Sequence, residues 1–463
     1  MHNVTIEEFA RRLRAREVTA LEITNSCLQR IDQLQPSLNA FIRVMADEAK
    51  RDAEAADREL ASGHDRGLLH GVPIAVKDII DVRGIPTTAA SRVREGHTAA
   101  VDAPVIVRLR DAGAVIIGKT NLDEFAFGTT SENSAFGVVR HPLDTSRSPG
   151  GSSGGSAVAV ATGMALAALG TDTGGSIRIP AAACGIVGLK PTLNEISTAG
   201  VVPLAKTFDH VGAFTRTVGD ATLLHQAMSA STGADRRLRG ADPRWSGADV
   251  PRSAKELCLG IPRGYLTDLL DDDVRARFDE AAAALRSAGA TLTDVSVPQA
   301  SLTPAVYIHI HSSEGATFHA RTLDSAPDRY TPVVRRRLEL GRYVLAQDYA
   351  RAMDGRAVLR REVDAALENC DALLLPTLPI PAPPLGAETM TIGGREEPVR
   401  ALMLRLTQLF NVTGHPAISL PCGTTSGGLP VGVELVGCWN QTERLLSMAQ
   451  VIEEKLSVRV SSN

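Results

Sequence analysis

From about residue 70 to about residue 230 the sequence alternates short apolar runs with helical stretches, separated by Gly and Pro. Two such runs, GVPIAVKD from Gly71 and GAVIIGKT from Gly113, are typical of buried strands. Strands that alternate with helices form a sheet whose faces the helices cover. The sequence therefore predicts an α/β fold with a central twisted mixed sheet, mostly parallel and flanked by helices.

No internal repeat and no clear boundary divides the chain, so we expect one large domain over residues 1–463. Residues 5–60 have the apolar spacing of helices, with a T-x-E-E start at Thr5 that is typical of a helix N-terminus. Residues 300–400 are predicted to be mostly helical and to form the substrate side of the domain.

Composition excludes several classes of protein. A net charge of −4 and a pI near 6.3 do not suit a dedicated nucleic-acid binder, so we expect no direct contact with nucleic acid. The first residues lack the apolar stretch of a signal peptide, and no run of about 18 uncharged apolar residues follows. The six cysteines are widely spaced without a C-x-x-C pair, which is typical of reduced thiols. We expect a cytoplasmic protein with no membrane contact.

The stretch SPGGSSGGSAVAVATG, Ser148 to Gly163, is too closely joined to an apolar run to be a flexible linker. Its GGSSG segment formally matches the nucleophile elbow G-x-S-x-G, with Ser152 at the centre. An elbow needs an apolar strand before it, whereas the preceding VVRHPLDTSRSP is polar and contains Pro. Ser152 is therefore not predicted to be an elbow nucleophile.

GAVIIGKT, Gly113 to Thr120, formally matches a phosphate-binding loop. In such a loop the four central residues must curl around the anion, but Ala-Val-Ile-Ile favours an extended strand. We therefore expect a core strand here and no nucleotide cofactor.

A second serine motif fits acyl transfer better. An apolar run, Ala165 to Gly170, leads into TDTGGS, and IPAAACG then starts a helix with Pro in its first turn. This strand-to-helix turn carries Ser176 and offers consecutive backbone N–H groups from Thr173 onward, which glycine allows to converge on one point. A serine beside converging N–H donors is what a nucleophile with an oxyanion hole requires.

A nucleophilic serine needs a base. The histidines are poor candidates, and the HIH at residues 309–311 is a weak metal signal without nearby carboxylates, so no metal site is predicted. Lys77 ends an otherwise apolar run, and burial would lower the pKa of its amine enough for it to act as a base. The alternative is a lysine at a strand end that pairs with Asp78 or Asp81.

Five segments in this order and spacing resemble the amidase signature family: GVPIAVKD, GKTNLDEFAFGTTSENSAFG, SPGGSSGGSAVAVA, GTDTGGSIRIPAAACGIVGLKPT and GHPAISLPCG. The resemblance is strongest over residues 65–220, the signature core. It implies the amidase signature fold and an amidase that acts on linear amides without a metal or organic cofactor.

The resemblance also implies roles for individual residues. Ser176 would be the nucleophile of a Ser–cisSer–Lys triad, with Ser152 as the bridging serine, Lys77 as the base and the Gly151–Ser152 peptide in cis. Ser153 would help to orient Lys77. The oxyanion hole would consist of the backbone amides of Thr173, Gly174, Gly175 and Ser176.

Members of the family hydrolyse simple amides, fatty-acid amides or ureides, or supply ammonia as the glutamine-hydrolysing subunit of tRNA-dependent amidotransferases. TNLDEFAFGTTSENSAFG resembles the last group, but those subunits carry an acidic residue for the glutamine amino group just before the N-x-x-G-x-P stretch. Here Val399 to Pro416 contains no Asp or Glu. We therefore predict hydrolysis of a small amide or ureide, and the alternative is the glutamine-hydrolysing component of a tRNA-dependent amidotransferase.

Phe127, Gly128 and Arg337 are candidate substrate-binding residues. Arg337 could present a cation to a substrate carboxylate, or it could belong to a solvated basic helix face. The expected partner is a small-molecule amide, and a homodimer or a small partner subunit is compatible with the sequence.

Overall fold

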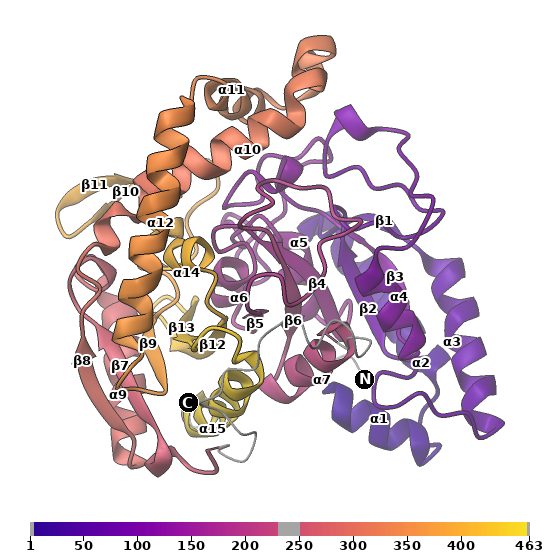
Figure 1. Ribbon diagram of the computed structural model, residues 1–463. Helices are drawn as coiled ribbons and strands as arrows, with labels where there is room; N and C mark the ends of the chain where they lie inside the picture. Colours follow the sequence, from indigo (N-terminus) through magenta and orange to yellow (C-terminus); the bar gives the residue numbers. More distant parts are fainter. Residues whose placement is uncertain (1–3, 230–250, 461–463) are drawn as a thin grey trace.

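The computed structural model describes residues 4–229 and 251–460, and an eleven-stranded sheet forms the centre of this part of the chain (Figure 1). The order of the strands across the sheet is β1-β3-β2-β4-β6-β5-β12-β13-β9-β7-β8, and β10 and β11 form a separate hairpin. The bounds of the strands are β1 (Phe41–Val44), β2 (Pro73–Lys77), β3 (Val115–Thr120), β4 (Ala167–Asp172), β5 (Val187–Lys190), β6 (His210–Thr215), β7 (Cys258–Pro262), β8 (Thr291–Val295), β9 (Ala372–Pro376), β10 (Thr389–Ile392), β11 (Arg395–Pro398), β12 (Ala417–Thr424) and β13 (Pro430–Val436).

The predicted α/β fold with a central mixed sheet is confirmed, but "mostly parallel" is wrong for the strands that the structure describes. Parallel pairs occur in two places, where β2 pairs with β3 and β4 and where β7 pairs with β8 and β9. The strands between them, from β4 to β9 across the sheet, pair antiparallel, as does β1 with β3. Crossover helices join the parallel strands, whereas a short turn joins β12 to β13 and makes that pair antiparallel.

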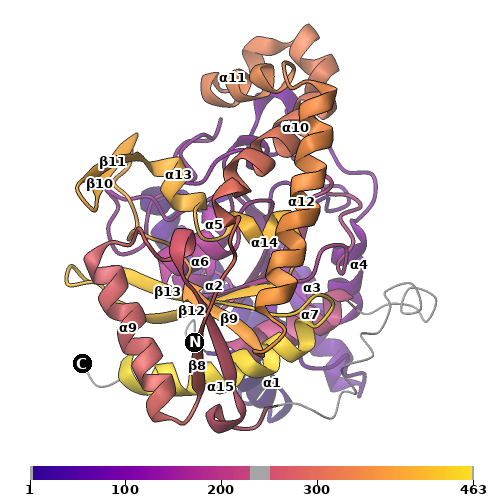
Figure 2. The ribbon, with the colours of Figure 1, turned by 60° about the vertical axis from the view of Figure 1, so that its left-hand side comes forward.

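Helices cover the sheet, and Figure 2 shows α6 and α14 on one side of β12 and β13 with α15 on the other. Helices α10 and α11 lie at one end of the molecule, and α12 runs from that end down to the level of β9 (Figures 1 and 2). The bounds of the helices are α1 (Ile6–Arg14), α2 (Ala20–Leu38), α3 (Ala46–Ala61), α4 (Pro104–Asp111), α5 (Gly154–Ala161), α6 (Arg178–Cys184), α7 (Val218–Ser229), α9 (Asp272–Ser287), α10 (Thr303–Ser325), α11 (Pro332–Gly341), α12 (Ala346–Ala366), α13 (Val399–Leu404), α14 (Gln408–Thr413) and α15 (Thr442–Val460). No helix in the described ranges is long and apolar enough to cross a membrane.

The N-terminal helices begin where their capping residues predict. The Thr5 hydroxyl accepts a hydrogen bond from the Glu8 amide at the start of α1. Thr19 and Glu22 cap each other's backbone at the start of α2. Between α2 and α3 lies β1, an edge strand within the region that the sequence predicts to be helical.

The segment that imitates a phosphate-binding loop is strand β3, fully buried along its length, as its β-branched residues predict. Its Lys119 forms an ion pair of 2.9 Å with Asp78, and both side chains are buried. Asp78 is therefore paired with Lys119 rather than with its neighbour Lys77.

Candidate active site

Lys77 lies at the end of β2, next to the parallel strand β4, and its side chain is fully buried. Its Nζ donates a hydrogen bond to Ser152 Oγ at 2.9 Å and another to Thr171 Oγ1 at 2.8 Å. Burial lowers the pKa of Lys77 to about 7, although the carboxylates of Asp123 and Asp172 act in the opposite direction. At neutral pH a large fraction of this amine is therefore uncharged and able to accept a proton.

Thr171 is a site residue that sequence reasoning missed. It lies within the last two residues of β4, and its hydroxyl supports the Lys77 amine together with Ser152. Ser153, expected to orient Lys77, makes no hydrogen bond with it in the described part of the chain: its Oγ donates to the Thr171 carbonyl at 3.1 Å. Ser153 therefore supports Thr171, which in turn holds the lysine.

Ser152 begins the turn into α5, and the peptide between Gly151 and Ser152 is cis. The turn is packed so closely that a Cβ at Gly151 would lie 2.5 Å from the Asp123 carboxylate. The same carboxylate accepts hydrogen bonds from the backbone amides of Ser131 and Asn133. The Asp123 carboxylate thus orders its own loop, and the Asp123 amide donates to the Ser152 carbonyl at 3.2 Å, which joins this loop to the turn that carries Ser152.

The turn after β4 carries Ser176, which is 5% exposed and makes no hydrogen bond within the described residues. The amides of Thr173, Gly174 and Ser176 have no acceptor there either. The expectation that Gly175 also contributes is not met in this structure, because its N–H donates to Asp172 Oδ1 at 2.7 Å. Three of the four expected amides are therefore available to an oxyanion.

A buried charge network holds this turn. Arg178, in the first turn of α6, donates to Asp172 at 3.0 Å and to Glu434 at 2.5 Å, and all three side chains are fully buried. Burial alone would raise the pKa of Asp172, but the Arg178 guanidinium lowers it below its usual range. The Asp172 carboxylate therefore stays charged and accepts the amides of Gly175 and Ile177, which fixes the loop around Ser176.

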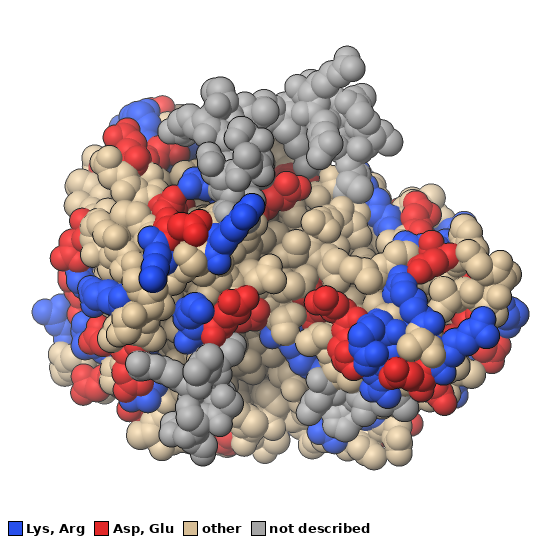
Figure 3. Space-filling view, turned by 90° about the horizontal axis from the view of Figure 1, so that it is seen from below, with Lys and Arg blue, Asp and Glu red and all other residues tan. Residues whose placement is uncertain are grey.

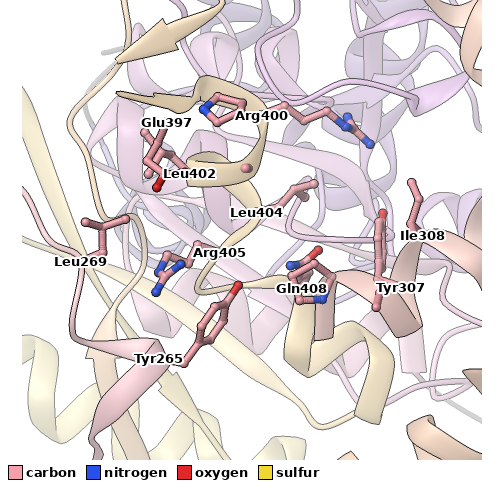
Figure 4. A pocket seen from close by; sticks show the side chains of 14 residues that line it. Tyr265, Leu269, Tyr307, Ile308, Glu397, Arg400, Leu402, Leu404, Arg405 and Gln408 are labelled. Atoms are coloured by element: carbon pink, nitrogen blue, oxygen red, sulfur yellow. The ribbon is translucent and has the colours of Figure 1, made fainter. Parts of the chain in front are cut away.

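A cavity of about 490 Å³ lies near this turn, between α10 and the segment of α13 and α14 (Figure 4). Tyr307 and Leu404 line it and also reach the turn, since a Cβ at Gly174 would lie 2.6 Å from Tyr307 Oη and 3.1 Å from Leu404 Cδ2. Thr407 donates to the Gly174 carbonyl at 2.7 Å. Tyr307 and Leu404 therefore lie between this cavity and the turn that carries Ser176.

The three sequence-based candidates for substrate binding lie close to one another. Arg337, on α11, donates to the backbone carbonyl of Phe127 and lies 5.7 Å from the centre of its ring. Gly128 packs against the Asp123 carboxylate, where a side chain would not fit. Arg400, which the sequence analysis did not single out, lies 5.6 Å from the same Phe127 ring. No sequence pattern connects residues 127, 337 and 400, because only the fold brings them together.

The arrangement suits acyl transfer. The Lys77 amine, whose pKa is lowered to about 7, contacts Ser152. Ser176 lies in the turn after the neighbouring strand β4, beside amides that have no acceptor among the described residues. No group of three or more His, Cys, Asp or Glu residues able to hold a metal ion occurs in residues 4–229 and 251–460.

A family model described as Amidase matches residues 22–446. A relative from Desulfatibacillum aliphaticivorans is 36% identical over 97% of this chain and 96% of its own length. Another, from Prochlorococcus marinus (strain MIT 9303), is 40% identical over 98% of each chain. The names of both relatives describe the A subunit of glutamyl-tRNA(Gln) amidotransferase.

Two solved structures resemble the fold along its whole length. One, described as a crystal structure of amidase, has a TM-score of 0.90 and 36% identity and covers 98% of this chain and 100% of its own. The other is an inhibitor-bound "vestigial protein complex" described as revealing the origins of an s-triazine catabolic enzyme. It has a TM-score of 0.89 and 32% identity and covers 98% of this chain and 99% of its own.

The relatives overturn one expectation from the sequence, that of no direct contact with nucleic acid. Their names describe a subunit of glutamyl-tRNA(Gln) amidotransferase, and a tRNA is a nucleic acid. The expectation depended on net charge, and on the face shown in Figure 3 Lys and Arg are indeed interspersed with Asp and Glu. Net charge describes the average surface of a chain and carries no information about a substrate bound by a larger assembly.

Proposed function

This chain belongs to the Amidase family, and we propose that it hydrolyses the C–N bond of an amide through an acyl-enzyme on Ser176. The observation that carries the proposal is the buried Lys77 amine, with a pKa near 7, in hydrogen-bond contact with Ser152. An uncharged lysine cannot form an ion pair, so such a pair does not explain its position here. A serine relay, in contrast, requires an uncharged amine as its base.

In this mechanism Lys77 takes a proton from Ser152 while Ser152 takes one from Ser176, whose Oγ attacks the amide carbonyl. The free amides of the turn stabilise the negative oxygen, each by about 3 kcal/mol if it acts like other oxyanion donors. The proton returns through Ser152 to the leaving nitrogen, and water then releases the acid. Ser152 and Ser176 make no hydrogen bond with each other in the described part of the chain, and this bond would form when substrate is bound.

Residues 65–220 would supply this catalytic core, and residues 300–400 the substrate side, of one domain over residues 1–463. Phe127 and Gly128 would form the wall of the substrate site, and Arg337 would contact a polar group of the substrate. The support is the cavity geometry, since Phe127 and Arg337 line one hollow. Ile308 and Arg400 line both this hollow and the cavity near the Ser176 turn.

Two biological roles share this chemistry. The names of the full-length relatives favour hydrolysis of glutamine within a glutamyl-tRNA(Gln) amidotransferase over the small-amide role expected from the sequence. One observation favours a small amide instead. Among the described residues, the part of this cavity's lining that comes from the segment before the N-x-x-G-x-P stretch, residues 400–408, includes Arg400 and Arg405 but no carboxylate to receive the glutamine ammonium group.

Ammonia release by the purified chain tests both the chemistry and the role. The substrates are glutamine, acetamide, an aryl amide and a biuret-like ureide, with Ser176→Ala as the inactive control. Release from at least one amide, lost in the control, supports amide hydrolysis. Release from glutamine alone, and only with partner subunits and tRNA present, supports the amidotransferase role. No release from any of them under either condition contradicts the proposal.

A further inference from the structure

Arg400 lies in the wall of the cavity without a charged partner. It is partly buried on α13, and it makes no hydrogen bond or ion pair with any described residue. It lies against the Phe127 ring, at 5.6 Å from the ring centre. Burial lowers the pKa of its guanidinium, so the site would gain from an anion that compensates the charge.

Arg400 is linked to the turn that carries Ser176 through Leu404. It stands one helical turn before Leu404, so both side chains lie on the same face of α13. Leu404 contacts the Gly174 turn, and Tyr307 completes that contact from α10. Figure 4 shows the Arg400 guanidinium extending toward the side of the cavity formed by Tyr307 and Ile308.

The cavity has more positive than negative groups along its walls. Arg405 also lines it, stacked 3.9 Å over the Tyr265 ring, and its Nε has no hydrogen-bond partner in the described residues. Glu397 is the one acid among the described residues that line it, and it lies on the side opposite the Arg400 guanidinium (Figure 4). The buried Asp123 is already occupied by the amides of its own loop.

We propose that Arg400 makes this site selective for amides that carry a carboxylate and no ammonium group. The proposal rests on the proposed amide hydrolysis and specifies its substrate class. A carboxylate would receive charge-assisted hydrogen bonds from Arg400, beside the Arg337 guanidinium at the same Phe127 ring. An ammonium group in this cavity would be repelled by the Arg400 and Arg405 guanidinium groups, which disfavours it.

Three amides of matched length separate the effect of the carboxylate from that of the ammonium group. Glutaramate, the monoamide of glutaric acid, is glutamine without its ammonium group, and glutaramide is the neutral diamide. We expect kcat/KM for glutaramate to exceed that for glutamine and for glutaramide by about tenfold or more. A preference of the wild-type enzyme for glutamine or for glutaramide overturns the proposal.

Variants assign the selectivity to the arginine. Arg400→Met keeps much of the side chain's length and its packing on Phe127, and should lower kcat/KM for glutaramate about tenfold or more, mainly through KM. The same variant should change glutaramide hydrolysis by less than about twofold, and Arg400→Lys should retain part of the preference. Arg336→Met, which removes an exposed charge from α11, is the matched control. Equal losses on glutaramate and glutaramide would make Arg400 a structural residue and overturn the proposal.

Binding to the Ser176→Ala protein, measured by calorimetry, separates this inference from the proposed function. If the wild type hydrolyses no amide but glutaramate binds in an Arg400-dependent manner, the inference stands and the proposed function fails. If amides are hydrolysed but glutaramate binds no better than glutaramide, the proposed function stands and the inference fails.

Discussion

Replacement of Lys77 with methionine is expected to abolish amide hydrolysis and to remove a pH-dependent loss of stability. In the folded protein burial lowers the pKa of Lys77 from 10.5 to about 7. Between these two values the unfolded chain binds a proton that the folded protein does not, so the folded protein gains stability as pH rises. Below about pH 7 the penalty is fully present, and above about pH 10 it has disappeared.

The expected magnitude follows from the size of the shift. Each pH unit in this window changes the free energy of unfolding by about 1.4 kcal/mol, so the full shift corresponds to about 5 kcal/mol. Methionine leaves Ser152 and Thr171 without their amine partner, which destabilises by about 1–3 kcal/mol at every pH. The slope with pH, rather than the stability at one pH, therefore reports the lysine.

Denaturant unfolding of the wild type and Lys77→Met at several pH values between about 7 and 10 measures this slope. As the pH rises by about two units within this window, the free energy of unfolding of the variant relative to that of the wild type should fall by about 3 kcal/mol. Lys206→Met, at an exposed lysine, controls for the loss of one positive charge. A difference between Lys77→Met and the wild type that stays constant with pH would refute a neutral, buried Lys77.

Three other outcomes are expected. The kcat/KM of the wild type should rise with pH through about 7 and then level off, because only the uncharged Lys77 accepts the proton, and a pH–rate profile measures this. Gly174→Ala should lower kcat by about a hundredfold with little loss of stability, since the new Cβ would push Tyr307 away from the turn; steady-state kinetics and thermal unfolding separate the two effects. Arg178→Met should destabilise the protein by about 3–5 kcal/mol in denaturant unfolding, because it leaves two buried carboxylates without their cation.

Local sequence predicted those parts of the fold that neighbouring residues determine. The apolar run ending at Lys77 is strand β2, and the run expected at Ala165–Gly170 is β4, two residues further on. IPAAACG lies in α6, which ends at a left-handed Gly185. Strand direction was beyond this reasoning, because the antiparallel centre includes a pair of strands, β5 and β12, that lie more than 200 residues apart in the chain.

The candidate site divides in the same way. The Gly-rich turn singled out Ser176 as a candidate from its immediate neighbours, and an apolar strand singled out Lys77. The neighbours of Ser152 spoke only against an elbow nucleophile, and its proposed relay role came from the family resemblance. Thr171 carried a weaker signal, as a polar residue at the end of a strand next to that of Lys77. Sequence reasoning could not single out Arg400 as a candidate substrate-binding residue. Its proposed role depends on its lack of a charged partner among the described residues, which only the assembled cavity shows.

Fluorophosphonate labelling followed by peptide mass spectrometry tests the central claim, that Ser176 attacks the substrate with Ser152 and Lys77 as its proton relay. We expect a single covalent adduct on Ser176, absent in Ser176→Ala and formed much more slowly in Lys77→Met. An adduct on Ser152, or labelling of Ser176 at the same rate without the Lys77 amine, would contradict it.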